Sequence, residues 1–413
     1  MKNYKNILRF LILIIAILYA IKCSKSGRDF EIFIYAGYKL INGLNIYKPP
    51  FIQGLYYYYS PLFALLLAPL SKLPIMIPQF CWVFFSYFLL YHIWILCTEY
   101  FDTSLLTLKQ KQLWLGLSFF LALRFILFDI MCVQMTIFLL WATLKSIQLF
   151  RREQNITGAA LLAFAINIKL LPLAFVCYLF YRKKIKAGLL TCAFYVLYLF
   201  LPALYLGWDK NMSLLHDWFS LINPTNKQWT IEAGFGPSSL VALIPVYLTD
   251  TVGDMAVKRN FINLDFAQVT LILNVVRLIF VLLTLAFLRT MPFKSINNKI
   301  RQFYEMSYLF IVIPLLYPHQ QIYAFFYITP AFIYLTWYFI TNWSTLRPGM
   351  NFFKWAAFVV VGFSFTPLIG RDIIPIKLYE IFLHYRVLPM AAILLIVILW
   401  IYRPKAELAS PSF

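Results

Sequence analysis

Asp29 is the residue whose type and position point most directly to chemistry. It lies near the start of a polar stretch, residues 27–61, that follows the first apolar segment, and the chain has only 16 Asp and Glu residues among 413. A single carboxylate can act as a general base by taking a proton from an acceptor hydroxyl. Aspartate is also a favoured helix N-cap, so capping of a helix that begins at Phe30 is the competing interpretation.

Basic side chains can supply a second function, which is to hold a phosphate while negative charge develops on it. Lys169 lies at the turn of a short apolar hairpin, His319 follows a proline in an outer turn, and Arg371 lies in another outer loop. The competing interpretations are a snorkelling turn lysine, a hydrogen-bonded loop histidine and an interfacial anchor. Asp129 and Asp372 are reserve bases.

Three further residues complete the candidate binding set. Arg28 directly precedes Asp29, Tyr59 closes the aromatic run 56–59, and Gln134 lies between two apolar segments. The aromatic run is typical of an interfacial belt, but it also offers a ring that can stack on a sugar.

This set of residues fits transfer of a sugar from a lipid phosphate. A sugar on a polyprenyl phosphate already has a good leaving group, so one base and several phosphate-binding groups are sufficient. A base on the face opposite the leaving group gives inversion. No Gly-rich phosphate loop, nucleotide fingerprint or HExxH motif occurs, so the sequence predicts no nucleotide-sugar or metalloprotease mechanism, no metal and no cofactor.

Composition places the chain in a membrane. Hydrophobic residues make up 62% and charged residues 13%, which leaves too little polar surface for soluble domains of this length. The net charge of +20 comes from short basic clusters between apolar segments. Such clusters orient membrane proteins, so nucleic acid is not an expected partner. The six cysteines have no paired spacing, and we interpret them as core residues.

The apolar segments predict an all-α polytopic membrane protein, a single integral domain over residues 1–413 with about twelve spans. Residues 7–21 follow three basic residues and precede no small-residue cleavage site, so they are expected to be a retained first span. Residues 22–77 and 207–266 are the expected outer-face loops. The other expected spans are 78–98, 113–128, 131–150, 187–206, 267–288, 306–317, 322–340, 353–367 and 387–402.

An amphipathic helix is expected directly after the first span. From Phe30, apolar residues recur at helical spacing, and Glu31 and Tyr38 lie on the opposite face. This pattern favours a helix that lies along the membrane surface on the outer face and ends at Gly43.

Residues 157–181 are expected to form a short hairpin. Only about 24 apolar residues lie between two basic clusters, enough for a single span, yet both clusters are expected in the cytoplasm. Two half-length helices, 157–166 and 171–181, with a turn at 167–169 satisfy both conditions. Irregular backbone at membrane depth is tolerated where it lines a cavity, so Lys169 is expected at a cavity floor.

Short motifs occur in a fixed order along the chain: Asp29-Phe30, Tyr35-Ala36, Gly43, Tyr47, Tyr59-Ser60-Pro61, Pro69-Leu70, Leu73-Pro74, Gln134-Met135-Thr136, Gly158, Lys169-Leu170-Leu171-Pro172, Pro237-Ser238-Ser239-Leu240 and Pro318. This series resembles glycosyltransferase family 87, the polyprenyl-phosphate-mannose-dependent mannosyltransferases of the GT-C superfamily. The chain departs from the family pattern at Val133, where a Gly is usual, at Pro237-Ser238, where Asn-Gln is usual, and at His319, which is closer to its proline.

The resemblance implies a GT-C-like bundle and a membrane glycosyltransferase. Its substrates are then a polyprenyl-phosphate sugar, of which mannose is the expected hexose, and a lipid-linked or glycan acceptor, both met among membrane lipids. Its site then faces the extracytoplasmic side of the inner (plasma) membrane. Asp29 is then the general base, and the substrate- or phosphate-binding residues are Lys169, His319, Arg28, Gln134, Tyr59 and Arg371.

Two other classes of protein stay open at this point. A multi-spanning transporter or flippase is expected to show inverted repeats and paired charges deep in several spans, and the sequence has no detectable repeat. A polymerase or ligase of lipid-linked polysaccharide is expected to carry one very large outer loop.

Overall fold

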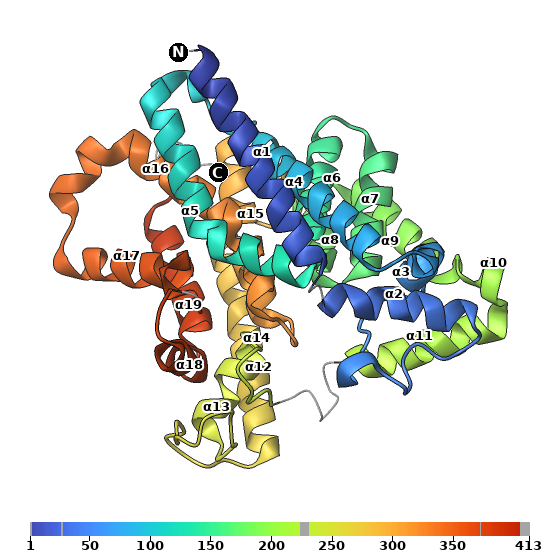
Figure 1. Cartoon of the computed structure of the whole chain (residues 1–413). Helices are drawn as coiled ribbons and strands as arrows, with labels where there is room; N and C mark the ends of the chain where they lie inside the picture. Colours follow the sequence, from blue (N-terminus) through green and yellow to red (C-terminus); the bar gives the residue numbers. More distant parts are fainter. Residues whose placement is uncertain (1, 26–27, 224–230, 372, 405–413) are drawn as a thin grey trace. The chain divides into compact units, whose positions relative to one another are not determined.

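The computed structural model describes residues 2–25, 28–223, 231–371 and 373–404, which form helices and loops (Figure 1). The β-pairing within these ranges is an isolated bridge between Pro237 and Gln321. The chain divides into two compact units. Unit 1 comprises Met1–Ile95, Leu127–Val176 and Ile185–Asn223, and unit 2 comprises Leu96–Ile126, Cys177–Lys184 and Pro224–Phe413.

The helices of the N-terminal half follow one another with short connections. They are α1 (Lys2–Ser24), α2 (Arg28–Ile41), η1 (Ile52–Gly54), α3 (Pro61–Leu67), η2 (Ala68–Lys72), α4 (Met76–Thr98), η3 (Thr103–Leu105), α5 (Leu108–Cys132), α6 (Thr136–Arg151), α7 (Asn155–Ile168), η4 (Leu171–Leu173), α8 (Ala174–Tyr181), α9 (Ile185–Phe200), α10 (Ala203–Leu206) and α11 (Trp208–Ile222).

The C-terminal half contains the remaining helices, all of them in unit 2. They are α12 (Leu240–Leu243), α13 (Pro245–Leu248), α14 (Phe266–Leu288), α15 (Lys299–Leu316), η6 (Ile322–Ile328), α16 (Thr329–Leu346), η7 (Arg347–Gly349), α17 (Phe352–Phe365), η8 (Pro367–Ile369), α18 (Ile376–His384) and α19 (Val387–Ile401).

Within the described residues, five helical segments are long and apolar enough to cross a membrane: Met76–Thr98, Leu108–Cys132, Ile185–Leu206, Phe266–Leu288 and Ile322–Gly349. Helices α18 and α19, bent by 61°, make a sixth if they are counted as one span. The predicted total of about twelve spans is therefore not confirmed, because α7, α17 and other apolar helices are shorter than a span requires. The predicted polytopic, all-helical character is confirmed.

Helix α2 is amphipathic, and its apolar side packs against protein. Phe30, Phe33 and Leu40 are buried, and the helix contacts α3 and η2 (Figure 1). Gly37 permits this close approach, because a Cβ there would lie 2.8 Å from the main-chain nitrogen of Ala68. The packing explains why the sequence shows a strong helical period here; a position on the outer face of a membrane stays a prediction.

Helix α2 ends at the predicted glycine. Gly43 has a φ of +77°, and the Gly43 and Leu44 amides donate to the carbonyls of Leu40 and Lys39 at 3.2 and 2.9 Å. This is the Schellman arrangement, in which a left-handed residue after the helix lets the last carbonyls find partners. Glycine adopts that conformation without a steric cost.

Helices α6, α7 and α9 pack together in unit 1. Phe164, near the end of α7, contacts Phe138 near the start of α6 and Tyr198 near the end of α9. Helix α7 therefore runs antiparallel to α6 and parallel to α9. Parallel neighbours need a returning connection, so residues 169–184 bring the chain back to the end at which α7 begins. The side of a membrane that this end faces stays a prediction.

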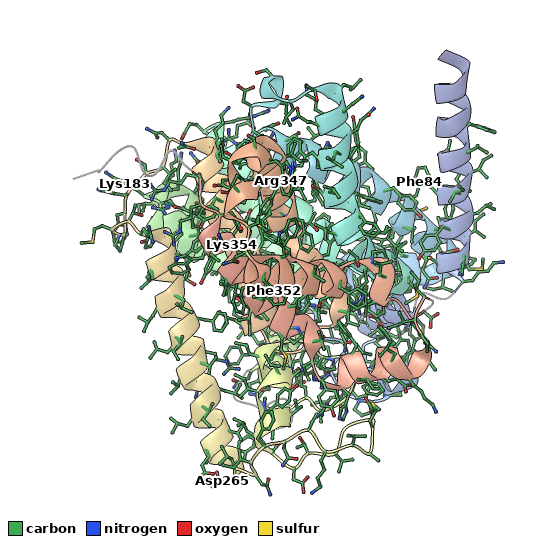
Figure 2. All side chains as sticks on the ribbon, turned by 90° about the vertical axis from the view of Figure 1, so that its left-hand side faces the viewer. Phe84, Lys183, Asp265, Arg347, Phe352 and Lys354 are labelled. Atoms are coloured by element: carbon green, nitrogen blue, oxygen red, sulfur yellow. The ribbon has the colours of Figure 1, made fainter. Side chains whose placement is uncertain are left out.

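In unit 2, α15 is buried along most of its length and packs against α14, α16 and α19. Figure 2 shows Lys183 and Asp265 at opposite ends of α14. Asp265 caps the start of α14 by accepting a hydrogen bond from the Gln268 amide at 2.8 Å. Beyond the other end, Arg182 donates to Thr290 Oγ1 at 2.6 Å. The long apolar helix is thus fixed by polar contacts at both ends.

Candidate active site

Asp29 lies in the first turn of α2, which begins at Arg28 and not at Phe30 as predicted. The cap position before Arg28 falls outside the described residues. Asp29 is half-buried, and its Oδ2 accepts a hydrogen bond from Gln134 Nε2 at 2.5 Å. A carboxylate in the first turn is also stabilised by the positive end of the helix dipole. Asp29 is therefore held by a side chain more than a hundred residues away.

Gln134 connects Asp29 to Tyr59. The Tyr59 hydroxyl donates to Gln134 Oε1 at 3.0 Å, while Gln134 Nε2 donates to Asp29. Trp82 Nε1 donates to the Gln134 main-chain oxygen at 3.0 Å and fixes the backbone. Because burial raises the pKa of Tyr59, and Asp29 and Asp129 raise it further, this phenol stays protonated and serves as a donor.

The end of α5 places Gln134 at this junction. The Val133 amide donates to Ile130 O at 3.1 Å and the Gln134 amide donates to Asp129 O at 2.9 Å, which again is the Schellman pattern. Val133 has a φ of +50°, a conformation in which a β-branched residue is strained. The family that the sequence resembles usually has glycine here; in this chain the buried Val133 side chain offsets part of the strain.

Asp129 and Lys169 accompany Asp29 in unit 1. Asp129 is 1% exposed. Thr136, at the start of α6, offers hydrogen bonds to its carboxylate, and Lys169 interacts with it electrostatically. Lys169 is half-buried at the end of α7 and interacts electrostatically with both Asp129 and Asp29. The predicted base, the reserve base and the predicted phosphate-binding lysine are thus brought together.

Ser60 and Asn167 are polar residues of this region that the sequence analysis did not select as site residues. Ser60 Oγ donates to Asn167 Oδ1 at 2.5 Å and also accepts from the Phe63 amide at 3.3 Å, which caps α3. Both side chains are fully buried. The sequence could have pointed to them, because Ser60 follows the selected Tyr59 and Asn167 lies two residues before the selected Lys169.

The electrostatics of the site favour a base at Asp29. Burial raises the pKa of the Asp29 carboxyl, whereas the hydrogen bond from Gln134 and the charge of Lys169 lower it. Burial has the largest effect, so the pKa is above the ordinary aspartate value. A raised pKa makes the carboxylate a better proton acceptor, which is the property that general-base catalysis needs.

For three other predicted site residues, a place beside this cluster stays a prediction. His319 belongs to unit 2, where it has a φ of +57° and its Nδ1 contacts a carboxylate oxygen of Glu232. Arg371 also belongs to unit 2 and is exposed. Arg28 is the first residue of α2, and its side chain lies outside the described part of the structure. Asp372, the other reserve base, lies outside it altogether. Phosphate binding by these residues stays a prediction.

The cluster around Asp29 combines several kinds of polar side chain. In the described ranges, no group of three or more His, Cys, Asp or Glu side chains is arranged to hold a metal ion. The arrangement instead combines carboxylates with an amide, a phenol and an ammonium group. These groups can take a proton, donate hydrogen bonds and stabilise a nearby anion.

Comparison with known proteins identifies a family for much of this region. The model described as Glycosyltransferase family 87 matches residues 57–297, more than half of the chain. Tyr59, Gln134 and Lys169 lie inside the matched range, whereas Asp29 and Arg28 precede it and His319 and Arg371 follow it. No curated protein matches the chain.

Proposed function

The chain belongs to glycosyltransferase family 87, and we propose that it transfers a hexose, mannose by first choice, from a polyprenyl-phosphate donor to a glycolipid or glycan acceptor. Family membership and several apolar helices make it a membrane glycosyltransferase. The finer proposal is an inverting reaction on the extracytoplasmic face of the inner (plasma) membrane, with no cofactor.

The observation that carries this proposal is the placement of Asp29. Its carboxylate is half-buried, is held by Gln134, and shares electrostatic interactions with Lys169. A carboxylate with only a structural role in α2 needs no partner from the end of α5. A base must be fixed in position, and a hydrogen bond from a rigid neighbour achieves that.

The reaction that this geometry supports is a single displacement. Asp29 takes the proton of the acceptor hydroxyl as its oxygen attacks the anomeric carbon. The new bond joins that oxygen to the anomeric carbon, and the bond from the anomeric carbon to the phosphate oxygen breaks. The electron pair leaves with the polyprenyl phosphate, whose charge is stabilised by Lys169. No protein acid is needed, because the phosphate is a good leaving group.

The direct test is transfer of label in membranes that contain the full-length chain. Radiolabelled polyprenyl-phosphate mannose is supplied, and labelled glycolipid is measured against membranes with the Asp29→Asn variant. Label is expected in glycolipid only with the unsubstituted chain. Polyprenyl-phosphate glucose and a nucleotide-linked mannose, supplied in parallel, report on the sugar and on the carrier. Absence of transfer from every polyprenyl-phosphate sugar would refute the proposal.

A further inference from the structure

Helix α14 carries two polar side chains, Asn274 and Arg277, at the middle of an apolar sequence. Eleven residues of the helix precede Arg277 and eleven follow it. At 1.5 Å of rise per residue, each end of α14 is about 16 Å away. The helix is one of the candidate membrane spans, so Arg277 lies near the centre of a hydrocarbon layer about 30 Å thick. A charge at that depth is costly, because only side chains near helix ends reach the headgroups.

The contacts of Arg277 leave its charge uncompensated within the described residues. Arg277 is half-buried, and its Nη1 donates to Asn274 Oδ1 at 3.1 Å. Asn274 is exposed and neutral. A guanidinium group has five N–H donors, and in the described ranges no carboxylate pairs with this one. The two side chains therefore form a polar pair on the surface of α14 that can still bind an anion.

The polar pair belongs to a regular stripe of exposed positions. These positions are Leu271, Asn274, Leu278, Val281 and Leu285. They are spaced alternately by three and four residues, which is the spacing of a helix–helix seam. Arg277 lies beside this stripe, at the flanking position that forms ion pairs between paired helices.

The opposite side of α14 is occupied by unit 2 itself. Leu273 and Phe280 are buried there, and the Thr284 hydroxyl donates to the hydroxyl of Tyr308 in α15 at 3.3 Å. The packing on α15 therefore fixes the rotation of α14 and turns the stripe outward from these contacts.

The depth of Arg277 decides which anion can pair with it. A lipid phosphate lies at the headgroup level, about 15 Å from the centre of the hydrocarbon layer. A free anion is excluded from hydrocarbon because it loses its hydration there. A carboxylate on another transmembrane helix is carried to this depth by its own backbone. The anion that fits Arg277 is therefore the side chain of a second helix.

A second copy of this chain does not provide that carboxylate. Two α14 helices face to face would bring like charges together, which is unfavourable. Of the five candidate spans in the described residues, the one that contains an Asp or Glu is Leu108–Cys132, and its Asp129 is buried. In the bent pair α18–α19, Glu380 is the fifth residue and lies near the end. The carboxylate must come from a different protein.

We propose that the exposed side of α14 docks a transmembrane helix of another protein, one that carries an aspartate or glutamate at mid-membrane. The carboxylate pairs with Arg277, Asn274 sets the register of the two helices, and the leucine stripe packs against the partner's apolar side chains. This interaction goes beyond the proposed function and does not depend on it.

The first experiment measures binding to synthetic transmembrane helices in neutral phosphatidylcholine nanodiscs. The full-length chain carries a fluorescent donor at its C-terminus, and a leucine-rich peptide of about 20 residues carries the acceptor dye. The peptide has aspartate, asparagine or leucine at its centre. The aspartate peptide is expected to bind about tenfold more tightly than the leucine peptide, the effect of one polar contact between helices. Equal binding of these two peptides overturns the proposal, and so does an asparagine peptide that binds as tightly as the aspartate peptide.

Variants of α14 then locate the binding. Arg277→Leu is expected to remove the preference for aspartate, whereas Arg277→Lys keeps the charge and should keep most of it. Lys258→Leu, which removes an exposed lysine of the same unit, is the matched control and should leave the preference unchanged. Leu278→Trp blocks the stripe and keeps Arg277, so it should weaken binding, while Ile279→Trp, at an exposed position beside the stripe, should not. A preference that survives Arg277→Leu, or equal binding by the two Trp variants, overturns the site.

Cross-linking in native membranes tests for the partner itself. A photoreactive side chain replaces Leu278 or, as a control, the exposed Val359 in α17 of the same unit. Position 278 alone is expected to give an adduct with a membrane protein that has an Asp or Glu in the middle of a span. The adduct should disappear with Arg277→Leu and when that carboxylate is replaced by its amide. Cross-links within the chain or between two copies of it, adducts with lipid alone, or a partner whose carboxylate is dispensable would overturn the proposal.

Discussion

The cluster around Asp29 in unit 1 and the cluster around Arg386 in unit 2 are both buried, but they use charge in different ways. Arg386 is 2% exposed, and within the described ranges its hydrogen bonds go to main-chain carbonyls. Its strongest contacts are at 2.7 Å, to the oxygens of Glu232 and Gly234. Arg259 adds a contact to Ala233 O at 2.9 Å. Two arginines thus fasten residues 232–237 to the rest of unit 2.

The cluster around Asp29 is built from side chains that interact with one another. Asp29 accepts from an amide, and Lys169 interacts with the carboxylates of both Asp29 and Asp129. A cage of main-chain carbonyls satisfies the donors of an arginine, and none of these carbonyls can take up or release a proton. Carboxylates and an ammonium group that face one another can exchange protons and accept a substrate. A buried charge alone is therefore a poor guide to function, and the nature of its partner is a better one.

His319 is a site candidate whose partner in unit 2 is a titratable side chain. The sequence placed it with the phosphate-binding residues, and the structure gives it a carboxylate partner, Glu232, whose main-chain oxygen is also held by Arg386. The nature of this partner resembles the cluster around Asp29, and phosphate binding by His319 stays a prediction.

The largest effect is expected from Asp29→Asn. The amide keeps the size of the carboxylate but cannot accept the proton, so transfer should fall by about 10²–10⁴-fold. Label transfer in membranes measures this, and the amount of folded protein should barely change. Glu31→Gln, on the same turn of α2, is the matched control and should keep nearly normal transfer. An active Asn variant would leave Asp29 as a structural residue and direct attention to Asp129.

Arg386→Met should have the largest effect on stability. Several buried carbonyls lose their donor, and each unpaired group costs on the order of 1–3 kcal/mol. Thermal unfolding in detergent is expected to show a strongly lowered Tm. Arg386→Lys should lose less, since an ammonium group still provides donors, and the exposed Arg371→Met should change stability by about 0.5 kcal/mol or less. A Tm for Arg386→Met close to that of the unsubstituted chain would contradict the comparison between the two clusters.

Gln134→Leu should change the pH dependence of transfer. The hydrogen bond from Gln134 lowers the pKa of Asp29, so its removal raises that pKa further above the ordinary value. A base is lost as the pH falls through its pKa, so the acidic limb of kcat/KM should move to higher pH. The rate at the optimum should fall about tenfold for one lost hydrogen bond.

Tyr59→Phe is the control for that experiment. It removes the bond to Gln134 Oε1 and keeps the bond from Nε2 to Asp29, so its acidic limb should move less. An identical pH profile for Gln134→Leu and the unsubstituted chain would mean that Gln134 does not set the basicity of Asp29.

Ser60→Ala should have the smallest effect, a loss of stability of about 1 kcal/mol from the cap of α3. Ser71→Ala, which removes a hydroxyl bonded only to the carbonyl of Ala68 in its own turn, should cost less. Thermal unfolding of the two variants measures the difference. No difference would show that the bond from Ser60 to Asn167 contributes nothing to this part of unit 1.

The positions and ends of several helices follow from residues that are close together in the sequence. The apolar runs predicted α4 and α14 to within two residues, and Gly43 marks the end of α2 as expected. Helices α11 and α18 were not predicted, because both are amphipathic and lie in segments rich in polar residues. Such signals depend on residues within a few positions of one another, so a single sequence carries them.

The arrangement of the site was decided by tertiary structure. Motifs singled out Asp29, Tyr59, Gln134 and Lys169, but Gln134 reaches Asp29 across 105 positions and Tyr59 across 75. The sequence did not predict that Lys39, on the apolar face of α2, is buried among carbonyl oxygens. The spacing of apolar residues and the composition of a segment determine whether that segment forms a helix. Which side chains meet depends on how helices distant in the chain pack, and that is settled by the shapes of many residues at once.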